Sequence, residues 1–186
     1  FTNMKKASTY DSWKDASNNK IVATTGNAGT AWRIYDGYTA PLLTSLFKNA
    51  VTVTNKQTTT YNKTSQTANL SAAVYDAAVD TNHIYACSDT NAGTYDLFYS
   101  DQQGYDLVND NNFVINPITL TATLMGDNVF TKEYDGDTTV DQVLTLGSTY
   151  TLDKVVSGDT VSIATNNTGS YNNKNAGDGK TISYTG

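Results

Sequence analysis

The sequence predicts an all-β fold, because residues that favour strands and turns dominate it and long helix-forming runs are missing. Threonine favours strands, asparagine favours turns, and both are abundant. Apolar residues make up 38% of this chain and charged residues 16%, and both shares are lower than in an average globular chain. Short runs that alternate apolar and polar residues are separated by turn-rich stretches. We therefore expect serial small β-sandwich modules, with a β-grasp-like arrangement as the alternative.

The clearest strand signal lies at 118–125, ITLTATLM, where apolar residues alternate with threonine as in a half-buried strand. Residues 71–79, SAAVYDAAV, contain enough alanine for a short helix, although we prefer a strand there. We expect the strands of each module to pair mostly with their neighbours in the sequence, in antiparallel fashion. Further strands are predicted at 51–55, 113–116, 142–146, 159–165 and 180–185.

An internal repeat runs through the chain. Residues 51–66 align with residues 120–139, since in each an alternating strand and a polar turn come before an aromatic residue followed by Asn or Asp. Further along, residues 91–100 align with residues 175–186, and both segments begin with Asn-Ala-Gly. Two copies in the same order indicate two related structural modules.

The repeat sets the expected domain boundaries. Module 1 is predicted at 51–117 and module 2 at 118–186, where the sequence stops before a final strand, and Pro117 marks the joint. Residues 1–50 are too few to build a core alone. We expect them to form short strands that cap module 1 or finish a preceding β-helix. The chain begins at Phe-Thr-Asn without an initiator methionine, and we interpret it as part of a longer protein.

The aligned turns, Tyr61-Asn62-Lys63 and Tyr134-Asp135-Gly136, have the residues of a structural turn. Asn and Asp side chains accept hydrogen bonds from the nearby backbone, and glycine tolerates a positive φ. The tyrosine is expected to bury its ring against a sheet and to keep its hydroxyl at the rim. Because the turn occurs at the same position in both copies, we interpret it as architecture. The predicted structural residues are Tyr61, Asn62, Gly93, Tyr134, Asp135, Gly136 and Gly177.

Three segments of module 2, KEYDGDTT, VVSGDTVSI and NKNAGDGKTIS, resemble the YDG-type module of bacterial filamentous-haemagglutinin-like adhesins. Residues 51–117 resemble the related MBG-type repeat of the same proteins. Residues 31–43, AWRIYDGYTAPLL, resemble the segment that precedes these repeats there. The departures from the family pattern are Lys63, where that repeat often has glycine, and an asparagine-rich loop at 166–175.

This resemblance implies a large secreted surface protein of a Gram-negative bacterium, exported by two-partner secretion. Modules of this kind are expected to form a stalk or display region that supports cell adhesion, aggregation or biofilm formation, and with them virulence. The implied partners are a host-cell receptor or glycan, neighbouring modules of the same adhesin, and an outer-membrane transporter during export.

The charge of the chain argues against two classes of partner. Its net charge is −6, its pI is near 4.5 and Arg33 is its only arginine. Phosphate groups of nucleic acids and anionic lipids require clustered Lys and Arg, so neither nucleic-acid binding nor membrane insertion is expected. No run approaches the roughly 20 apolar residues of a membrane span. No cofactor motif is present either, and we predict none.

Catalytic constellations are weak, and we predict that the chain is not an enzyme. His83 and Cys87 are the only residues of their kinds, and on one strand they would lie about 13 Å apart. Glu133, Asp135 and Asp137 cluster, but nothing indicates the groove that a carboxylate pair needs. We predict no catalytic, cofactor-binding or metal-binding residues. Calcium at Asp135 and Asp137 or at 109–112 is a minor alternative.

Direct binding of a receptor or glycan is the alternative function. Aromatic rings near polar groups occur in saccharide sites, and residues 1–50 are rich in them. Exposed rings there would favour binding, whereas burial of Trp13 and Trp32 would favour the stalk. The possible ligand contacts are Tyr10, Trp13, Trp32, Tyr35 and Tyr38.

Two covalent modifications are further alternatives. Asn62, Asn69 and Asn166 stand in the acceptor pattern for glycosylation. Lys132 or Lys174 could form an isopeptide bond, which requires a neutral buried lysine and a protonated acid beside it.

Overall fold

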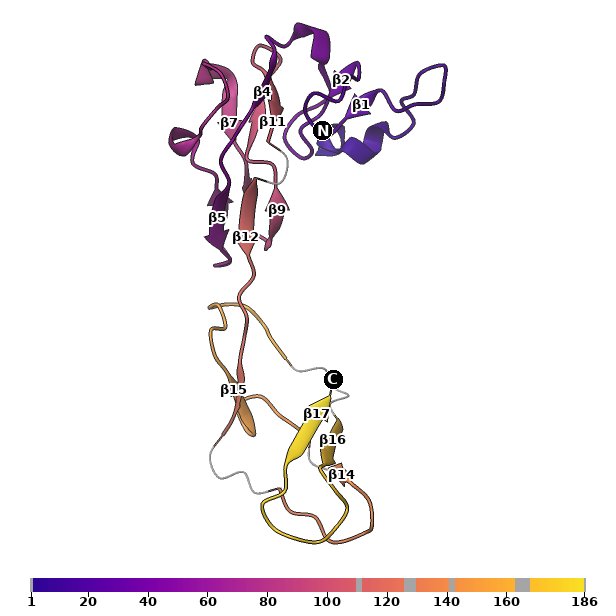
Figure 1. The fold of residues 1–186 in the computed structure, drawn as a ribbon, viewed down its shortest axis with the longest axis vertical. Helices are drawn as coiled ribbons and strands as arrows, with labels where there is room; N and C mark the ends of the chain where they lie inside the picture. The colour runs from indigo at the N-terminus through magenta and orange to yellow at the C-terminus, as the bar shows by residue number, and fades with distance from the viewer. Residues whose placement is uncertain (1, 110–111, 126–129, 141–142, 163–167, 186) are drawn as a thin grey trace. The chain divides into compact units, whose positions relative to one another are not determined.

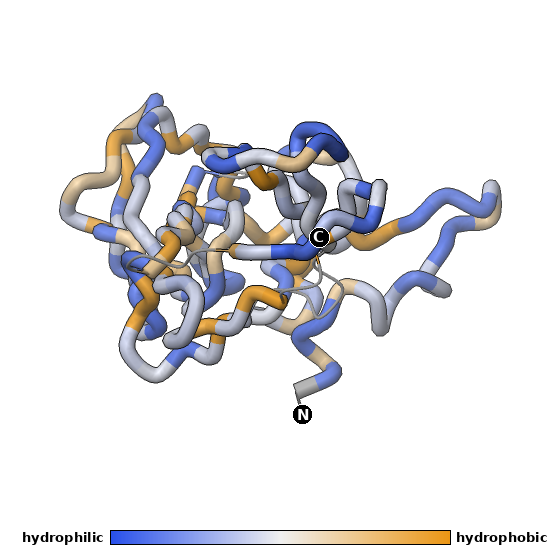
Figure 2. The backbone as a smooth tube through the Cα atoms, turned by 90° about the horizontal axis from the view of Figure 1, so that it is seen from below, coloured by the Kyte–Doolittle hydropathy of each residue, from blue (hydrophilic) through white to orange (hydrophobic). Residues whose placement is uncertain are grey.

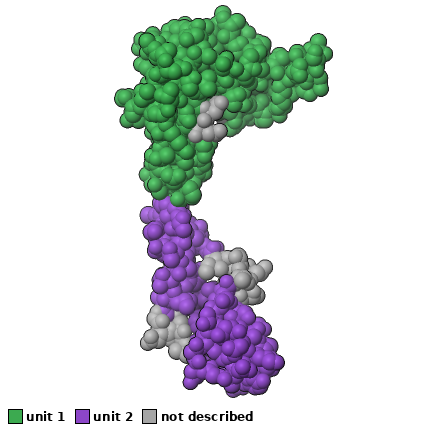
Figure 3. Space-filling view, in the orientation of Figure 1, with its two compact units in different colours: residues 1–117 green, residues 118–186 purple. Residues whose placement is uncertain are grey.

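The computed structural model describes residues 2–109, 112–125, 130–140, 143–162 and 168–185 (Figure 1). The chain divides into two compact units, unit 1 at Phe1–Pro117 and unit 2 at Ile118–Gly186 (Figure 3). Small sheets of two or three strands make up both units, and the described residues contain no α-helix. The predicted all-β class is therefore confirmed.

The longest ladder of unit 1 joins the first and last strands of the predicted module. Strand β4 (Ala50–Thr52) pairs in parallel with β11 (Asp106–Val108), and β5 (Gln57–Thr60) pairs in parallel with β12 (Phe113–Asn116). Both pairings have the same register, because each strand residue pairs with the one 56 positions later: Ala50 with Asp106 in the first pairing and Thr60 with Asn116 in the second. At about 3.3 Å per residue the two segments run side by side for roughly 30 Å.

This parallel ladder differs from the mostly local antiparallel pairing that the sequence predicts. Strand β9 (Gly93–Tyr95) does pair antiparallel with β12, so the central sheet is mixed, with the order β5-β12-β9 (Figure 1). Local alternation of apolar and polar residues indicates where strands form but not which strands pair. Pairing of strands far apart in the sequence requires a long loop to close, and that depends on the whole core. Parallel pairing of first and last strands is a feature of the β-grasp-like alternative.

The remaining strands of unit 1 form three small sheets. One is β1 (Val22–Ala23), β2 (Trp32–Arg33) and β3 (Leu42–Leu43); the others are β7 (Ile84–Ala86) with β10 (Phe98–Ser100), and β6 (Gln66–Thr67) with β8 (Ser88–Asp89). Short 3₁₀ helices lie at η1 (Thr2–Lys5), η2 (Ala7–Tyr10), η3 (Thr44–Leu46), η4 (Leu70–Ala72) and η5 (Thr81–His83).

The core of unit 1 forms along the parallel ladder. Val51 and Val53 are buried while Thr52 and Thr54 are exposed, as the alternation at 51–55 predicts. Residues 1–50 add Tyr35 and Phe47 to the same cluster, so they share unit 1 with the predicted module 1. The other buried members are Ala68, Ile84, Leu97, Phe98, Tyr105, Leu107, Phe113 and Ile115.

Apolar stretches are short and alternate with polar ones along the chain (Figure 2). No helix in the described parts of the chain is long and apolar enough to cross a membrane.

Asn109 directly follows β11, where the regular parallel pairing of β4 with β11 ends. Its side chain is fully buried, and its Oδ1 accepts hydrogen bonds from the backbone N–H of Leu97 at 2.6 Å and of Phe98 at 2.8 Å. Oxygens at 109–112 were a minor calcium alternative, but this oxygen satisfies two buried backbone donors. Residues 110 and 111 lie outside the described residues.

Unit 2 contains two small antiparallel sheets. Strand β13 (Ala122–Leu124) pairs with β15 (Tyr150–Leu152), and β16 (Thr168–Tyr171) lies between β14 (Thr139–Val140) and β17 (Ile182–Thr185). Among the described residues of unit 2, the buried apolar side chains are those of Val140 and Tyr150.

Several strand predictions need correction. At 118–125 the strand is confined to β13, whose three residues are all exposed, because no described element covers either face. Residues 71 and 72 end the 3₁₀ helix η4, and residues 73–79 form no strand beyond one bridge between Tyr75 and Val53, so neither the strand nor the alternative α-helix forms there. No strand forms at 143–146 or 159–162, and the rest of those two predicted strands lies outside the described residues. The strands predicted at 113–116 and 180–185 are confirmed by β12 and β17.

The buried Asn109 side chain leads to a prediction for the stability of unit 1. Asn109→Ala leaves the N–H groups of Leu97 and Phe98 buried without an acceptor, so we expect the free energy of unfolding to fall by about 2 kcal/mol. Urea denaturation of the full chain measures this loss. The control is Asn82→Ala, which changes an exposed asparagine. Equal unfolding midpoints for the two variants would contradict the role assigned to Asn109.

Candidate functional site

A cavity of about 650 Å³ in unit 2 lies between the segments 130–137 and 171–182. The sheet of β14, β16 and β17 brings these segments together. The first segment leads directly into β14, and the second contains the loop that joins β16 to β17. The motifs KEYDGDTT and NKNAGDGKTIS therefore form opposite walls of one cavity.

The first wall is a turn held by its own carboxylates. Asp135 Oδ1 accepts a hydrogen bond from the Asp137 N–H at 3.0 Å, and Asp137 Oδ1 accepts one from the Thr139 N–H at 2.8 Å. Between the two aspartates, Gly136 has a φ of +85°, which glycine adopts at little cost. These bonds satisfy backbone donors where β14 begins.

The aligned turn in unit 1 has the same geometry. Asn62 Oδ1 accepts a hydrogen bond from the Thr64 N–H at 2.9 Å, and Lys63 has a φ of +65°. Lys63 therefore occupies the left-handed position that Gly136 occupies in the second copy. A residue with a Cβ is strained there by about 1–2 kcal/mol. The sequence alignment of the two turns thus pairs residues in equivalent conformations.

Lys132 joins the two carboxylates of the unit 2 turn. Its Nζ lies 2.7 Å from Asp135 Oδ2, contacts the Asp137 carboxylate, and donates to the Thr139 carbonyl at 2.9 Å. Hydrogen bonds from Lys132 lower the pKa of Asp135 and of Asp137, and hydrogen bonds to both raise the pKa of Lys132. The amine is thereby held in its charged form, which opposes the nucleophilic role that an isopeptide bond would require. We call these three residues the lysine clamp.

Tyr134 corrects the expectation that the tyrosine of each turn buries its ring. Its side chain is 70% exposed and stands at the rim of the cavity. Tyr61, its counterpart in unit 1, is half-buried and packs against the hydrophobic core. The difference follows from the surroundings, since unit 1 offers an apolar core beside its turn and the described part of unit 2 does not.

The second wall is a loop closed by Asn173. Its Oδ1 accepts hydrogen bonds from Lys180 Nζ at 2.5 Å and from the Asn175 N–H at 3.1 Å. Gly177 lies in this loop with open space within 4 Å of the place where a Cβ would stand. Gly93, its aligned partner, lies in β9, where a Cβ would meet the Tyr95 hydroxyl at 2.7 Å. A Cβ would therefore meet a neighbouring side chain at Gly93 and no other atom at Gly177.

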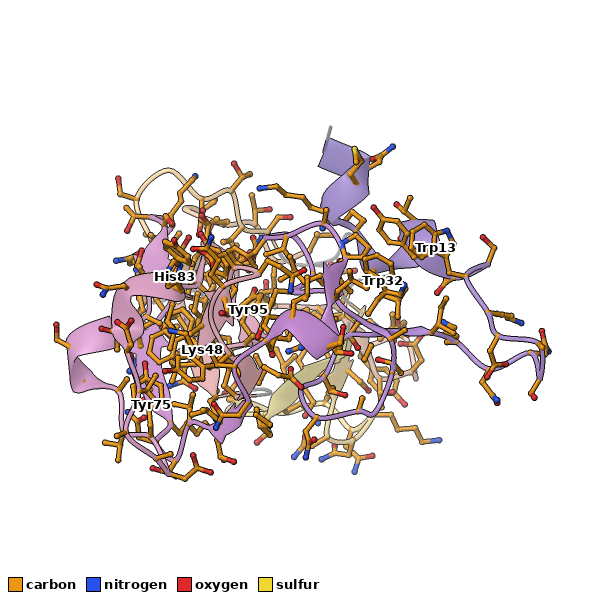
Figure 4. The ribbon with its side chains drawn as sticks, turned by 90° about the horizontal axis from the view of Figure 1, so that it is seen from above. Trp13, Trp32, Lys48, Tyr75, His83 and Tyr95 are labelled. Carbon is orange, nitrogen blue, oxygen red and sulfur yellow. The ribbon has the colours of Figure 1, made fainter. Side chains whose placement is uncertain are left out.

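Three of the five predicted ligand contacts form one aromatic cluster in unit 1. Trp13 meets Tyr10 edge to face with ring centroids 4.9 Å apart, and meets Trp32 at 5.8 Å (Figure 4). Tyr10 is buried and donates its hydroxyl to the Met4 carbonyl, and Trp32 is half-buried. Trp13 is 40% exposed, so it supplies most of the aromatic surface of this cluster.

The other two predicted ligand contacts are tied into unit 1. Tyr35 is fully buried, and its hydroxyl donates to the Tyr105 carbonyl at 3.2 Å and accepts from the Leu107 N–H at 3.0 Å. This corrects its assignment, because Tyr35 has no surface to offer a ligand. The hydroxyl of Tyr38 donates to the Ser88 carbonyl at 2.6 Å and accepts from the Ser88 N–H at 2.8 Å. Burial raises the pKa of Tyr38 to about 12.

Arg33, which sequence reasoning noted only as the sole arginine, is fully buried in unit 1. Its Nε lies 3.4 Å from Asp106 Oδ1, its Nη2 lies 3.9 Å from Asp96 Oδ2, and its guanidinium stacks 4.2 Å from the Tyr35 ring centroid. Buried charges of this kind need partners. The arginine therefore fixes β2 against β11. In the sequence, its position between the apolar residues Trp32 and Ile34 was the signal that could have indicated this burial.

The remaining candidate residues that the structure describes belong to unit 1. His83 Nδ1 lies 2.9 Å from Asp101 Oδ2, whereas Cys87 is fully buried and its pKa is raised by that burial. Asn69 caps η4 by accepting from the Ser71 N–H, and Asn166 lies outside the described residues. Glycosylation at Asn62, Asn69 and Asn166 stays a prediction. No group of three or more His, Cys, Asp or Glu residues placed to hold a metal occurs in the described part of the chain.

Comparison with known proteins identifies unit 2. Residues 117–186 match the family model of the YDG domain, a type of domain typical of bacterial surface or repeat proteins. The match includes both walls of the cavity. No curated protein and no solved structure matches the chain.

The left-handed residues of the two turns give a reciprocal prediction. Gly136→Ala places a Cβ at φ +85°, so we expect unit 2 to lose about 1 kcal/mol of stability. At the aligned position of unit 1, we expect Lys63→Gly to be more stable than Lys63→Ala by about the same amount. Calorimetric melting of the full chain measures both changes. Comparing glycine with alanine at residue 63 removes the effect of losing the lysine side chain. Unchanged melting of Gly136→Ala would contradict a structural role for this turn.

The lysine clamp predicts a pH dependence of unit 2. The lowered pKa values of Asp135 and Asp137 mean that their contribution is complete above the ordinary value of 3.8 and is lost as the pH falls below it. The raised pKa of Lys132 means that its contribution is complete below 10.5 and is lost as the pH rises through the higher folded value. We therefore expect the melting temperature of unit 2 to fall in acid, and Lys132→Met to flatten that fall.

The control for the clamp is Lys174→Met, which removes an exposed charge from the opposite wall of the cavity. Its melting temperature should follow the wild-type dependence on pH. If Lys132→Met and Lys174→Met change the acid limb equally, net charge rather than the clamp controls it.

Proposed function

We propose that the chain is a stalk and display segment of a large bacterial surface adhesin, in which its modules support cell adhesion, aggregation or biofilm formation. The observation that carries this proposal is the parallel pairing of β4 and β5 with β11 and β12. The chain enters this ladder at Ala50 and leaves it after Asn116, at the opposite end. Such a module adds its own length, roughly 30 Å, to any chain in which it is inserted.

Antiparallel first and last strands would return the chain to the end at which it entered and would add little length. The YDG domain in unit 2 supports the proposal further, because such domains are typical of bacterial surface or repeat proteins. The resemblance of residues 51–117 to a repeat of filamentous-haemagglutinin-like adhesins, and of residues 31–43 to the segment that precedes such repeats, agrees with it.

The proposal includes a location and partners. The parent protein is exported to the surface of a Gram-negative bacterium by two-partner secretion, through an outer-membrane transporter. With one cysteine, this chain has no internal disulfide that would have to open or form during export. Its partners are neighbouring modules, together with a host-cell receptor or glycan that the adhesin contacts. Neither nucleic-acid binding, membrane insertion nor a reaction is proposed.

A display experiment tests the spacer function. A peptide tag is anchored on a Gram-negative bacterium with long surface polysaccharide, either directly, through residues 1–186, or through a flexible Gly-Ser linker of equal length. We expect antibody-coated beads to capture cells best when residues 1–186 carry the tag, because a folded spacer holds its ends apart and a flexible chain does not. If residues 1–186 gave no better capture of cells than direct anchoring of the tag, the proposal would be wrong.

Direct binding of a glycan is the second candidate, and the exposed Trp13 ring favours it. If the Trp13 cluster binds sugars, labelled 1–186 should bind a glycan array or epithelial cells saturably, and Trp13→Ala should weaken that binding at least tenfold. The stalk proposal instead predicts no saturable binding by either protein.

A point variant is the suitable probe, because deleting residues 1–50 would remove Tyr35 and Phe47 from the core of unit 1. Tyr134→Ala is the matched control, since it removes an exposed aromatic ring from unit 2. Equal loss of binding in both variants would show that the Trp13 cluster is not the specific site.

A further inference from the structure

We propose that the parallel ladder of unit 1 is a mechanical clamp, which resists tension along the chain by loading its hydrogen bonds in shear. The biological use of the clamp rests on the proposed function, because only a stalk between an anchor and an attached surface carries tension. The mechanical property itself belongs to unit 1 and is measurable alone.

The direction of the force follows from the pairing. Tension on the chain pulls the segment of β4 and β5 from its Ala50 end and the segment of β11 and β12 from its Asn116 end, so the two paired segments are pulled in opposite directions along their length. Because the strands are parallel, the two segments must slide past one another, and the bonds between them share the force. If the same strands were pulled apart at one end, the bonds would break one after another. A shear-loaded ladder therefore unfolds at a higher force, since forced unfolding is governed by the barrier.

Hydrogen bonds continue across the gap between the two paired stretches. The Val53 N–H donates to the Val108 carbonyl at 3.0 Å, and Asn112 Nδ2 donates to the Val53 carbonyl at 3.2 Å. The Gln57 N–H then donates to the Asn112 carbonyl at 2.8 Å. Hydrogen bonds of described residues thus connect the pairing of β4 with β11 to the pairing of β5 with β12.

Buried side chains oppose sliding. Val51, Leu107 and Ile115 on the two segments are at most 1% exposed. A slip of one residue would turn each of them to the other face of its strand, because side chains alternate with a period of two. Sliding must therefore break the core as well as the ladder.

Residues 26–35 support β11 from the side that does not face β4. The Leu107 N–H donates to the Tyr35 hydroxyl at 3.0 Å, and the buried Arg33 lies beside the Asp106 carboxylate. At Gly26 a Cβ would lie only 2.2 Å from the Leu107 carbonyl oxygen, so the backbone of residue 26 lies directly against β11. These contacts hold β11 in place beside β4 while the ladder is loaded in shear.

Single-molecule pulling in two directions tests the clamp on the full chain. Asn49→Cys with Asn116→Cys places the handles at opposite ends of the ladder and loads it in shear. Thr60→Cys with Asn116→Cys places both handles at one end and unzips it. The Asn116 handle is common to both proteins, and all three positions are exposed. The native Cys87 is buried with a raised pKa, so maleimide handles attached under reducing conditions should leave it unmodified.

We expect a several-fold higher unfolding force in shear than in unzipping, at equal chemical stability of the two variants in urea. Equal forces in the two directions, or a higher force in unzipping, would overturn the clamp. That result would leave the spacer function intact, because the display experiment depends on length and not on strength. Conversely, poor display with a strong shear response would overturn the proposed function and retain the clamp as a property of the fold.

Discussion

The parallel pairing of β4 with β11 and of β5 with β12 is the constraint on which unit 1 depends. It joins the first and last strands of the module, so the chain between them must cross from the end of the ladder where β5 finishes to the opposite end, where β11 begins. Strands β6 to β10 lie in that connection, and the apolar side chains of β7 and β10 fill the core against Val51, Leu107 and Ile115. The ladder thus fixes both the core and the direction in which the chain leaves.

The N-terminal segment is part of this arrangement. Its contribution is polar as well as apolar, because the buried Arg33 faces Asp106 and the Tyr35 hydroxyl bridges the backbone of Tyr105 and Leu107. Removing one partner from a buried charge pair is costly, because the other is left without compensation. Residues 1–50 therefore cannot be regarded as a separable cap, and the aromatic surface at Trp13 is carried by a segment that the fold of unit 1 needs.

The two copies of the repeat share a turn but differ in what surrounds it. Asn62 and Asp135 accept the same backbone hydrogen bond, and the residue that follows each is left-handed. In unit 1 the turn lies beside a core and its tyrosine is half-buried, whereas in unit 2 the tyrosine stands at the rim of a cavity and a lysine joins the two aspartates. One local motif has thus been used in two environments, and in unit 2 it belongs to the YDG domain.

The sequence alone determined the fold class and the local turns, because both depend on neighbours in the chain. Period-two alternation marked β4, β12 and β17, and Asn or Asp followed by a left-handed position marked both turns. Only the tertiary structure decided that the first and last strands pair in parallel, that Tyr35 and Arg33 are buried, and that two distant motifs face one cavity. These features arise from contacts between residues far apart in the sequence. Such contacts form only when long loops close around the whole core, and the local alternation of apolar and polar residues does not record them.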